Sequence, residues 1–195
     1  MKSISLILSL ILALSATSLS AQEIDFGQYG NYTLTVGELS TEDLDFGTIV
    51  SGSGIYSIGI NNGKVVTITG VEYLDVIVEV TAQSELYLNG NPGNAGNPQK
   101  AIPFTLEAAY ANNVGTPNVG QAKFLNVSGN ALITQFPILE RQNVPPGPPP
   151  PPPTNAFDQS KVEDTAYLYL YGSINVGNVD AGSYSSEITV TINYD

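Results

Sequence analysis

The residues of this sequence with the clearest capacity for chemistry are the carboxylates of "GELSTEDLDFG": Glu38, Glu42, Asp43 and Asp45. A pair of carboxylates can act as acid and base in glycoside hydrolysis, and several together can bind calcium. Their spacing matches no catalytic pattern that we recognise. We therefore interpret the stretch as a solvated, charged turn, and the alternative is a calcium site here or in "EDTAY".

Other common catalytic and metal-binding side chains are missing. The sequence contains no His and no Cys, which excludes zinc sites of the imidazole or thiolate type and Ser-His-Asp or Cys-His catalysis. The formal net charge is −12, and such a surface repels nucleic acid and anionic lipid. We therefore expect no enzymatic activity, no cofactor, no nucleic-acid partner and, apart from the calcium alternative above, no metal ion.

An aromatic row is the most prominent candidate binding surface. In "AYLYLYG", Tyr167, Tyr169 and Tyr171 alternate with Leu168 and Leu170. In a strand, alternate side chains point to opposite faces. If the leucines face the core, the tyrosines point to the opposite face, where we expect solvent and a surface that could bind a glycan.

A proline-rich stretch, "NVPPGPPPPPPTN", is predicted to be a surface loop over residues 144–155. Its prolines favour the polyproline II conformation. Such segments dock on aromatic grooves at low entropic cost. Two hypotheses follow: Pro148–Pro153 pack on the tyrosine row, or the loop projects freely.

The elements that would position these residues are short strands separated by turns. The alternation of apolar and polar residues predicts the following strands: "NYTLTVGEL", "DLDFGTIV", "GIYSIGI", "KVVTITGV", "YLDVIVEVTAQ", "ELYLNG", "FTLEAAYA", "QAKFLNV", "ALITQFPI", "AYLYLYGSINVG" and "YSSEITVTINYD". Asn62-Gly63 suits a type I′ hairpin turn. No stretch has helical periodicity. The pattern predicts an all-β, antiparallel sandwich or barrel.

The first residues have the layout of a secretory signal peptide. Lys2 precedes an apolar run, and small residues follow at Ser18, Ser20 and Ala21. The run is too short to span a bilayer, which needs about 20 residues. We expect a signal peptide over residues 1–21, cleavage after Ser20 or Ala21, and no membrane span in the mature chain.

The end of the chain shows the most regular alternation. Read from Ile188, alternate residues are Ile188, Val190, Ile192 and Tyr194, and Gly182 stands a short distance before them. A glycine at this distance, alternating apolar residues and a penultimate aromatic residue resemble the C-terminal pattern of chaperone–usher pilus subunits. An ordinary final strand of a sandwich would also alternate in this way.

A second resemblance rests on "DLDFGTIVSGSG" and "LYLYGSINVGNVDAGSYSSEITVTINY". These stretches are similar to the two signature regions of a family of secreted bacterial, pilin-like domains, the domain of unknown function 4402. The resemblance implies an immunoglobulin-like β-sandwich that lacks one strand and is completed by a strand donated from another chain.

This resemblance divides the chain into an N-terminal extension and a domain. Residues 22–36 would form an N-terminal extension that contains the candidate donor strand, and residues 37–195 would form the sandwich. Ile24 and Phe26 alternate, and so do Tyr32, Leu34 and Val36, and the sequence leaves open which set is donated. The predicted assembly residues are Ile24, Phe26, Gly182, Ile188, Val190, Ile192 and Tyr194.

The predicted function is that of a secreted structural subunit of a cell-surface filament, a pilus or fimbria, which polymerises by strand donation. Its partners would be copies of itself or related subunits, a periplasmic chaperone and an outer-membrane assembly protein. The alternative is a monomeric secreted β-sandwich that binds a glycan or a surface through the tyrosine row or the loops. The expected location is the cell surface, reached through the periplasm.

Overall fold

The computed structural model describes residues 32–113, 115–140 and 162–195. The chain divides into two compact units, Met1–Asn31 and Tyr32–Asp195, and the fold described here is that of the second. The predicted signal peptide, the residues Ile24 and Phe26, and the proline-rich loop 144–155 lie outside the described residues. In the part that is described, no helix is long and apolar enough to cross a membrane.

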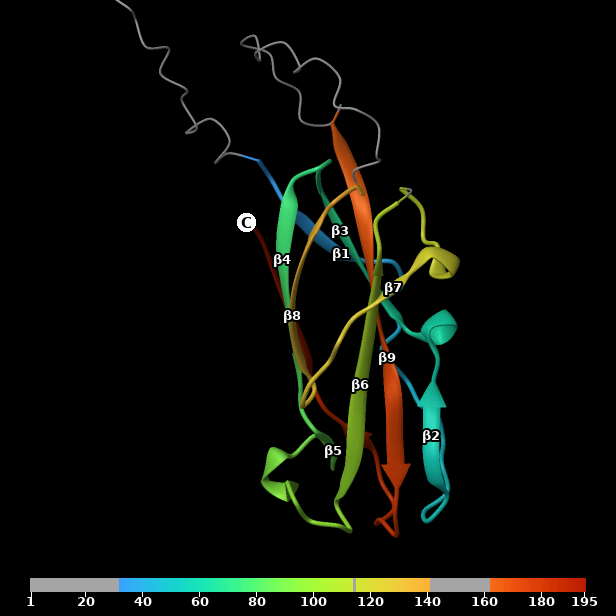
Figure 1. Cartoon of the computed structure of the whole chain (residues 1–195). Coiled ribbons are helices and arrows are strands. Elements are labelled where there is room, and N and C mark those ends of the chain that lie inside the picture. The colour runs from blue at the N-terminus through green and yellow to red at the C-terminus, as the bar shows by residue number, and fades with distance from the viewer. Residues whose placement is uncertain (1–31, 114, 141–161) are drawn as a thin grey trace, which may run out of the picture. The chain divides into compact units, whose positions relative to one another are not determined.

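Strands account for nearly all the regular structure of the described chain, as the alternating patterns predicted. The only other elements described are three short 3₁₀ turns (Figure 1). In chain order the elements are β1 (Thr35–Glu38), β2 (Gly54–Ile58), η2 (Ile60–Asn62), β3 (Lys64–Val71), β4 (Asp75–Ala82), β5 (Glu85–Leu88), η3 (Pro92–Asn94), β6 (Ala101–Ala111), η4 (Val119–Gln121), β7 (Lys123–Phe124), β8 (Ala131–Pro137), β9 (Glu163–Val176), β10 (Tyr184–Ser185) and β11 (Ile188–Tyr194).

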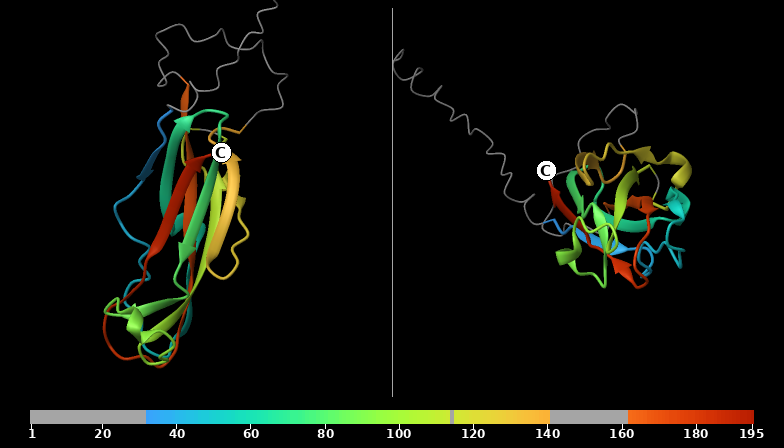
Figure 2. Two further views of the ribbon diagram at one scale, coloured as in Figure 1. Left: turned by 90° about the vertical axis from the view of Figure 1, so that its left-hand side faces the viewer. Right: turned by 90° about the horizontal axis from the view of Figure 1, so that it is seen from below.

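The strands form two antiparallel sheets. The larger sheet has the order β1-β3-β9-β6-β5-β10, with β2 paired to β9 and β7 paired to β6. The smaller sheet has the order β11-β4-β8, and its strands run side by side in the left view of Figure 2. The fold is therefore an all-β antiparallel sandwich, which confirms the predicted fold class.

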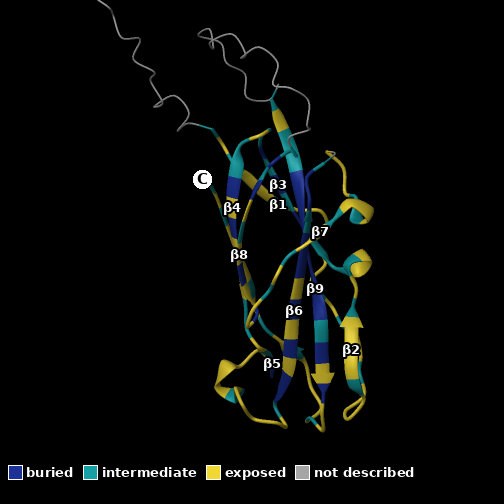
Figure 3. Cartoon of the chain, viewed as in Figure 1, coloured by how far each residue is buried: buried dark blue, intermediate teal, exposed yellow. Residues whose placement is uncertain are grey.

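The core lies between the two sheets. Val76, Val78 and Val80 of β4 are fully buried, as their alternation predicted, and Leu168 and Leu170 of β9 face them from the larger sheet. Figure 3 shows β9 buried along most of its length, whereas β6 alternates between buried and exposed positions. Fully burying one such side chain stabilises the fold by about 1.5–3 kcal/mol, so this shared core determines which faces the sheets turn inward.

β9 has a glycine, Gly172, at the point where its neighbouring strand changes from β3 to β2. β9 pairs with β3 up to Leu170 and with β2 from Gly172 onward. Gly172 has a φ of 156°, and a side chain there would collide with the carbonyl oxygen of Thr105 on β6. Only glycine accepts this close backbone contact, and it lets one long strand serve two partners.

Two predictions about local structure were wrong. Asn62-Gly63 does not form a type I′ hairpin, because Gly63 has a φ of −75° and both β2 and β3 pair with β9 instead of each other. The stretch "DLDFGTIV" is not a strand. It is irregular, and Leu44, Phe46 and Ile49 pack against the core from it.

The first strand of the sandwich begins within the predicted extension 22–36. Thr35–Glu38 form β1 and pair with β3, and Leu34 packs against the core. Val36 is about half exposed. The alternating set of Tyr32, Leu34 and Val36 is therefore part of the sandwich, which leaves residues 22–31 as the stretch in which a donor strand would lie.

Candidate functional site

The candidate site lies beside β11, the last strand of the chain. β11 pairs with β4 on one side only and has no strand on its other side in the described residues. Ile188, Val190, Ile192 and Tyr194 are half-buried and pack against the core, while the residues between them are exposed. The alternation predicted for this strand is confirmed, and its position is an open edge.

The backbone N–H and C=O groups on the unpaired side of β11 belong to the residues that pack against the core: Ile188, Val190, Ile192 and Tyr194. The Gln83 N–H donates to the Glu187 carbonyl oxygen at 3.5 Å, and the Asp195 N–H donates to the Asp75 carbonyl oxygen at 3.1 Å. In an antiparallel pair, alternate residues direct their N–H and C=O groups to opposite sides. The odd-numbered residues of β11 therefore bond to β4, and the even-numbered ones face the open side.

A groove of about 1120 Å³ runs along this edge, and Ile188 and Val190 line it. Its floor consists of apolar side chains from neighbouring strands of the larger sheet: Val66 of β3, Leu170 of β9, Phe104 of β6 and Leu86 of β5. An unpaired ladder beside apolar side chains is the arrangement that accepts an added strand.

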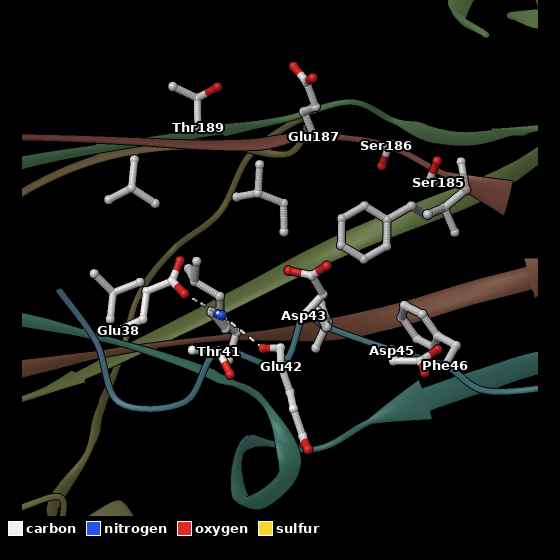
Figure 4. Close-up of a pocket in the computed structure, with 18 of the residues that line it drawn as sticks. Glu38, Thr41, Glu42, Asp43, Asp45, Phe46, Ser185, Ser186, Glu187 and Thr189 are labelled. Carbon is white, nitrogen blue, oxygen red and sulfur yellow. Dashed lines mark hydrogen bonds and ion pairs between the residues drawn. The ribbon is translucent and has the colours of Figure 1, made fainter. Parts of the chain in front are cut away.

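Segment 38–46, which is irregular after Glu38, the last residue of β1, forms the opposite wall of the groove (Figure 4). Leu44 and Phe46 pack against the core from this segment, and the ring of Phe46 meets that of Phe104 edge-on at 6.2 Å between centroids. The segment forms no ladder with β11. It therefore supplies apolar side chains to the groove but leaves the backbone groups of β11 unpaired.

Lys64 holds the beginning of that wall in place. Its ammonium group lies 2.8 Å from the Glu38 carboxylate, 2.9 Å from the Ser40 carbonyl oxygen and 2.8 Å from the Glu42 carbonyl oxygen. The lysine side chain is only 11% exposed. A charged donor shared among three oxygens is a strong local constraint, and it fixes the turn that leads from β1 into segment 38–46.

The rim of the groove is acidic. The four carboxylates singled out in the sequence all line it and are exposed, as a solvated turn predicts, and Glu187, the residue before β11, joins them from the other side. In the described residues Glu38 pairs with Lys64, and none of the other four has a basic partner. No three His, Cys, Asp or Glu side chains that the structure describes are grouped so that they could hold a metal ion.

One end of the β11 edge is tied to the start of the domain. The Tyr194 hydroxyl donates to the Thr33 carbonyl oxygen and accepts from the Val71 N–H. Ile192 and Tyr194 do not line the groove. Of the predicted assembly residues that are described, Ile188 and Val190 are therefore the ones at the open part of the edge.

Gly182 lies in a different place. It belongs to the connection between β9 and β10, where it packs close to the Leu88 side chain, and it lines a second cavity of about 420 Å³. Leu44 and Phe46 line both cavities. The glycine thus stands at the far side of segment 38–46, away from the open edge of β11.

The tyrosine row points away from the leucines, as predicted, but it is not exposed. Tyr167, Tyr169 and Tyr171 are 6%, 1% and 6% exposed. Side chains from other parts of the chain pack against them: Ile60, Val65, Val119 and Ala122. The prediction of a solvent-facing row was wrong, because Ile60 and residues 115–122 cover this face of the larger sheet.

The tyrosine hydroxyls bond to the segment that covers them. Tyr167 donates to the Gly115 carbonyl oxygen at 2.9 Å, and Tyr169 accepts from the Asn118 N–H at 2.9 Å. Burial raises the pKa of both hydroxyls. The row is a second small core, and it offers no open platform for a glycan or for polyproline.

Sequence reasoning missed the floor of the groove and Lys64. The floor residues belong to four strands that are far apart in the sequence, so no local pattern joins them. The alternation of Leu44 and Phe46 in "DLDFG" was a usable signal, because it marks side chains that must be buried. The lone lysine at the start of the apolar run "KVVTITGV" was a second usable signal, because a cation among apolar residues requires hydrogen-bond acceptors.

Comparison with known proteins gives little further information. No family model matches the chain, and no curated protein matches it. A chain in the solved structure "Chaperone-tip adhesin complex is vital for synergistic activation of CFA/I fimbriae biogenesis" is similar at 17% identity, with a TM-score of 0.37. The similarity covers 85% of this chain and 43% of that chain, so this protein spans less than half of its length.

The fold and the site together define a class of protein. It is an antiparallel β-sandwich whose C-terminal strand has an open edge, beside a groove with an apolar floor and an acidic rim. The resemblance to the pilin-like family of domain of unknown function 4402 remains a prediction.

Proposed function

We propose that the protein is a structural subunit of a cell-surface filament, and that its groove accepts an extended strand from a neighbouring subunit. The observation that carries the proposal is the open edge of β11, where free backbone groups and half-buried Ile188 and Val190 face one groove. An edge of this kind associates with other strands unless it is covered. A strand in the groove would pair with the backbone and fill the space above the floor.

The energetics favour a stable contact. Each large apolar side chain buried by the incoming strand contributes about 1.5–3 kcal/mol, so three or four such anchors supply roughly 4.5–12 kcal/mol before the costs of association and ordering are deducted. Residues 22–31 of another copy offer Ile24 and Phe26 at alternate positions, and a related subunit could offer a comparable strand. The layout of residues 1–21 supports export to the place where such a filament assembles.

The decisive experiment compares two substitutions on β11. Val190→Asp places a carboxylate against the apolar floor, where it has no partner. Asn193→Asp is the matched control, because Asn193 is exposed on the outer face of the same strand and lies opposite the uncharged Ile77. We expect the control to assemble and Val190→Asp to remain unassembled, as judged by electron microscopy of material sheared from expressing cells and by SDS-resistant bands that collapse on boiling.

A deletion tests the donor side separately. Removing residues 22–31 should leave a folded domain that can accept a strand but cannot donate one. If the full exported chain stays a folded monomer at high concentration, and residues 22–31 are protected from protease within it, the proposal is overturned. The protein is then a complete monomeric sandwich, which is the binding-module alternative.

A further inference from the structure

The exposed rim of the groove carries negative charge. Glu42, Asp43, Asp45 and Glu187 line the groove, are exposed and have no basic partner in the described chain. Figure 4 shows the Asp43 carboxylate directed from segment 38–46 toward the chain around β11, and the Glu187 side chain, from the residue before β11, directed away from Asp43. An added strand would lie between these two carboxylates.

The geometry of strand addition places the charges of the incoming strand beside this rim. When the apolar residues of an added strand point to the floor, the residues between them point outward. They then share a face with Thr189, an outward residue of β11, and with Glu187, which precedes the strand. Like charges on neighbouring strands destabilise pairing, and opposite charges stabilise it by roughly 0.2–1 kcal/mol per pair.

The N-terminal stretch of the chain itself has the wrong charge for this position. Residues 22–31 read "QEIDFGQYGN", so Glu23 and Asp25 flank the apolar Ile24, and the stretch has no Lys or Arg. If Ile24 and Phe26 were seated in the groove of another copy, Glu23 and Asp25 would stand on the acidic rim. Donation between identical copies therefore brings carboxylates together.

We propose that the groove selects a basic strand, one in which apolar residues alternate with Lys or Arg, and that this strand comes from a different protein. The proposal rests on the proposed function, because it assumes that the groove accepts a strand. It adds a rule of partner choice: the acidic rim disfavours the chain's own residues 22–31 and favours a cationic donor. The chain would then be joined to an unlike partner at its groove.

Peptide binding to the exported full chain tests this proposal. Two synthetic peptides of equal length are compared, in which isoleucine and valine alternate with lysine in one and with glutamate in the other. A third peptide consists of residues 22–31. We expect the lysine peptide to bind about tenfold more tightly than the other two at low salt. The advantage should shrink at high salt, because surface charges are then screened.

Substitutions separate the rim from the overall charge of the protein. Asp43→Asn combined with Glu187→Gln should reduce the advantage of the lysine peptide severalfold. The matched control is Glu72→Gln with Glu107→Gln, which removes two carboxylates that do not line the groove, and it should leave most of the advantage in place. Val190→Asp should abolish binding of every peptide.

The outcomes distinguish the two proposals. If no peptide binds, the groove is not an acceptor, and both the proposed function and the partner rule fail. If the lysine and glutamate peptides bind equally, the groove accepts strands but its rim does not select them, and the partner rule alone is overturned. Equal effects of the rim and control substitutions also overturn it, because the selection then comes from net charge.

Discussion

The hydroxyl of Tyr194 donates a hydrogen bond to the carbonyl oxygen of Thr33 at a distance of 3.1 Å, across 161 residues of sequence. The Tyr194 hydroxyl also accepts a hydrogen bond from the Val71 N–H at 2.9 Å. Chain ends usually fray unless tertiary contacts hold them. The penultimate tyrosine thus anchors the C-terminal strand to both the start of the domain and the larger sheet, and it keeps the edge of β11 in place for pairing.

Tyr194→Phe should lower the free energy of unfolding by about 1–2 kcal/mol, because it removes both hydrogen bonds and leaves the Val71 N–H without its partner. Urea denaturation measures the change. Tyr56→Phe is the control, since Tyr56 is 40% exposed and the substitution should cost less than about 0.5 kcal/mol. Equal effects of the two substitutions would contradict the anchoring role.

Lys64→Met should destabilise the domain by about 1–3 kcal/mol, because Glu38 and two carbonyl oxygens lose a charged donor. Lys123→Met is the matched control. Lys123 lies 2.7 Å from Glu140, but both side chains are more than 40% exposed, and such surface pairs contribute about 0–1 kcal/mol. Limited proteolysis should also show cleavage in segment 38–46 for the Lys64 variant alone, if the lysine fixes the wall of the groove.

Asn130→Asp should destabilise the domain by about 3 kcal/mol at neutral pH. The buried amide accepts the Leu106 N–H and donates to the carbonyl oxygens of Gln83 and Phe104, and an ionised carboxylate cannot donate. Protonation restores a donor, so the penalty should shrink in acid. The control is Asn175→Asp, because Asn175 lies at an exposed position of β9. This substitution should change the free energy of unfolding little at either pH. A penalty independent of pH would contradict this account.

Stability should fall at alkaline pH. Burial raises the pKa of Tyr169, the bond from the Asn118 N–H partly offsets this, and Tyr167 adds to the rise. A group whose pKa is higher in the folded state contributes fully below its unfolded pKa, about 10 for tyrosine. That contribution is lost as the pH rises through the folded value.

The free energy of unfolding should therefore be flat near neutral pH and decline above about pH 10. Tyr169→Phe should make the decline shallower than it is in the unsubstituted protein. Urea denaturation at a series of pH values, with tyrosinate absorbance as the titration signal, gives both quantities. Identical slopes for Tyr169→Phe and the unsubstituted protein would show that Tyr169 does not contribute to the decline.

The local patterns of the sequence determined most of the segments that form strands and which side chains point inward. The alternation from Ile188 to Tyr194 is such a case, because the period of two is a property of the extended backbone itself. The valines of β4 and the opposite directions of Leu168 and Tyr169 follow from the same rule. The exposed carboxylates of segment 38–46 follow from the cost of burying unpaired charge.

Only the tertiary structure decided which strands pair and what covers each face. β2 and β3 look like a hairpin in the sequence, yet both pair with β9, because distant partners with matching apolar faces compete with local turns. The tyrosine row is buried because Val119 and Ile60 are brought over it from far along the chain. The edge of β11 is likewise open because no described strand lies beside it. Nothing in the residues of β11 itself indicates that this neighbour is missing.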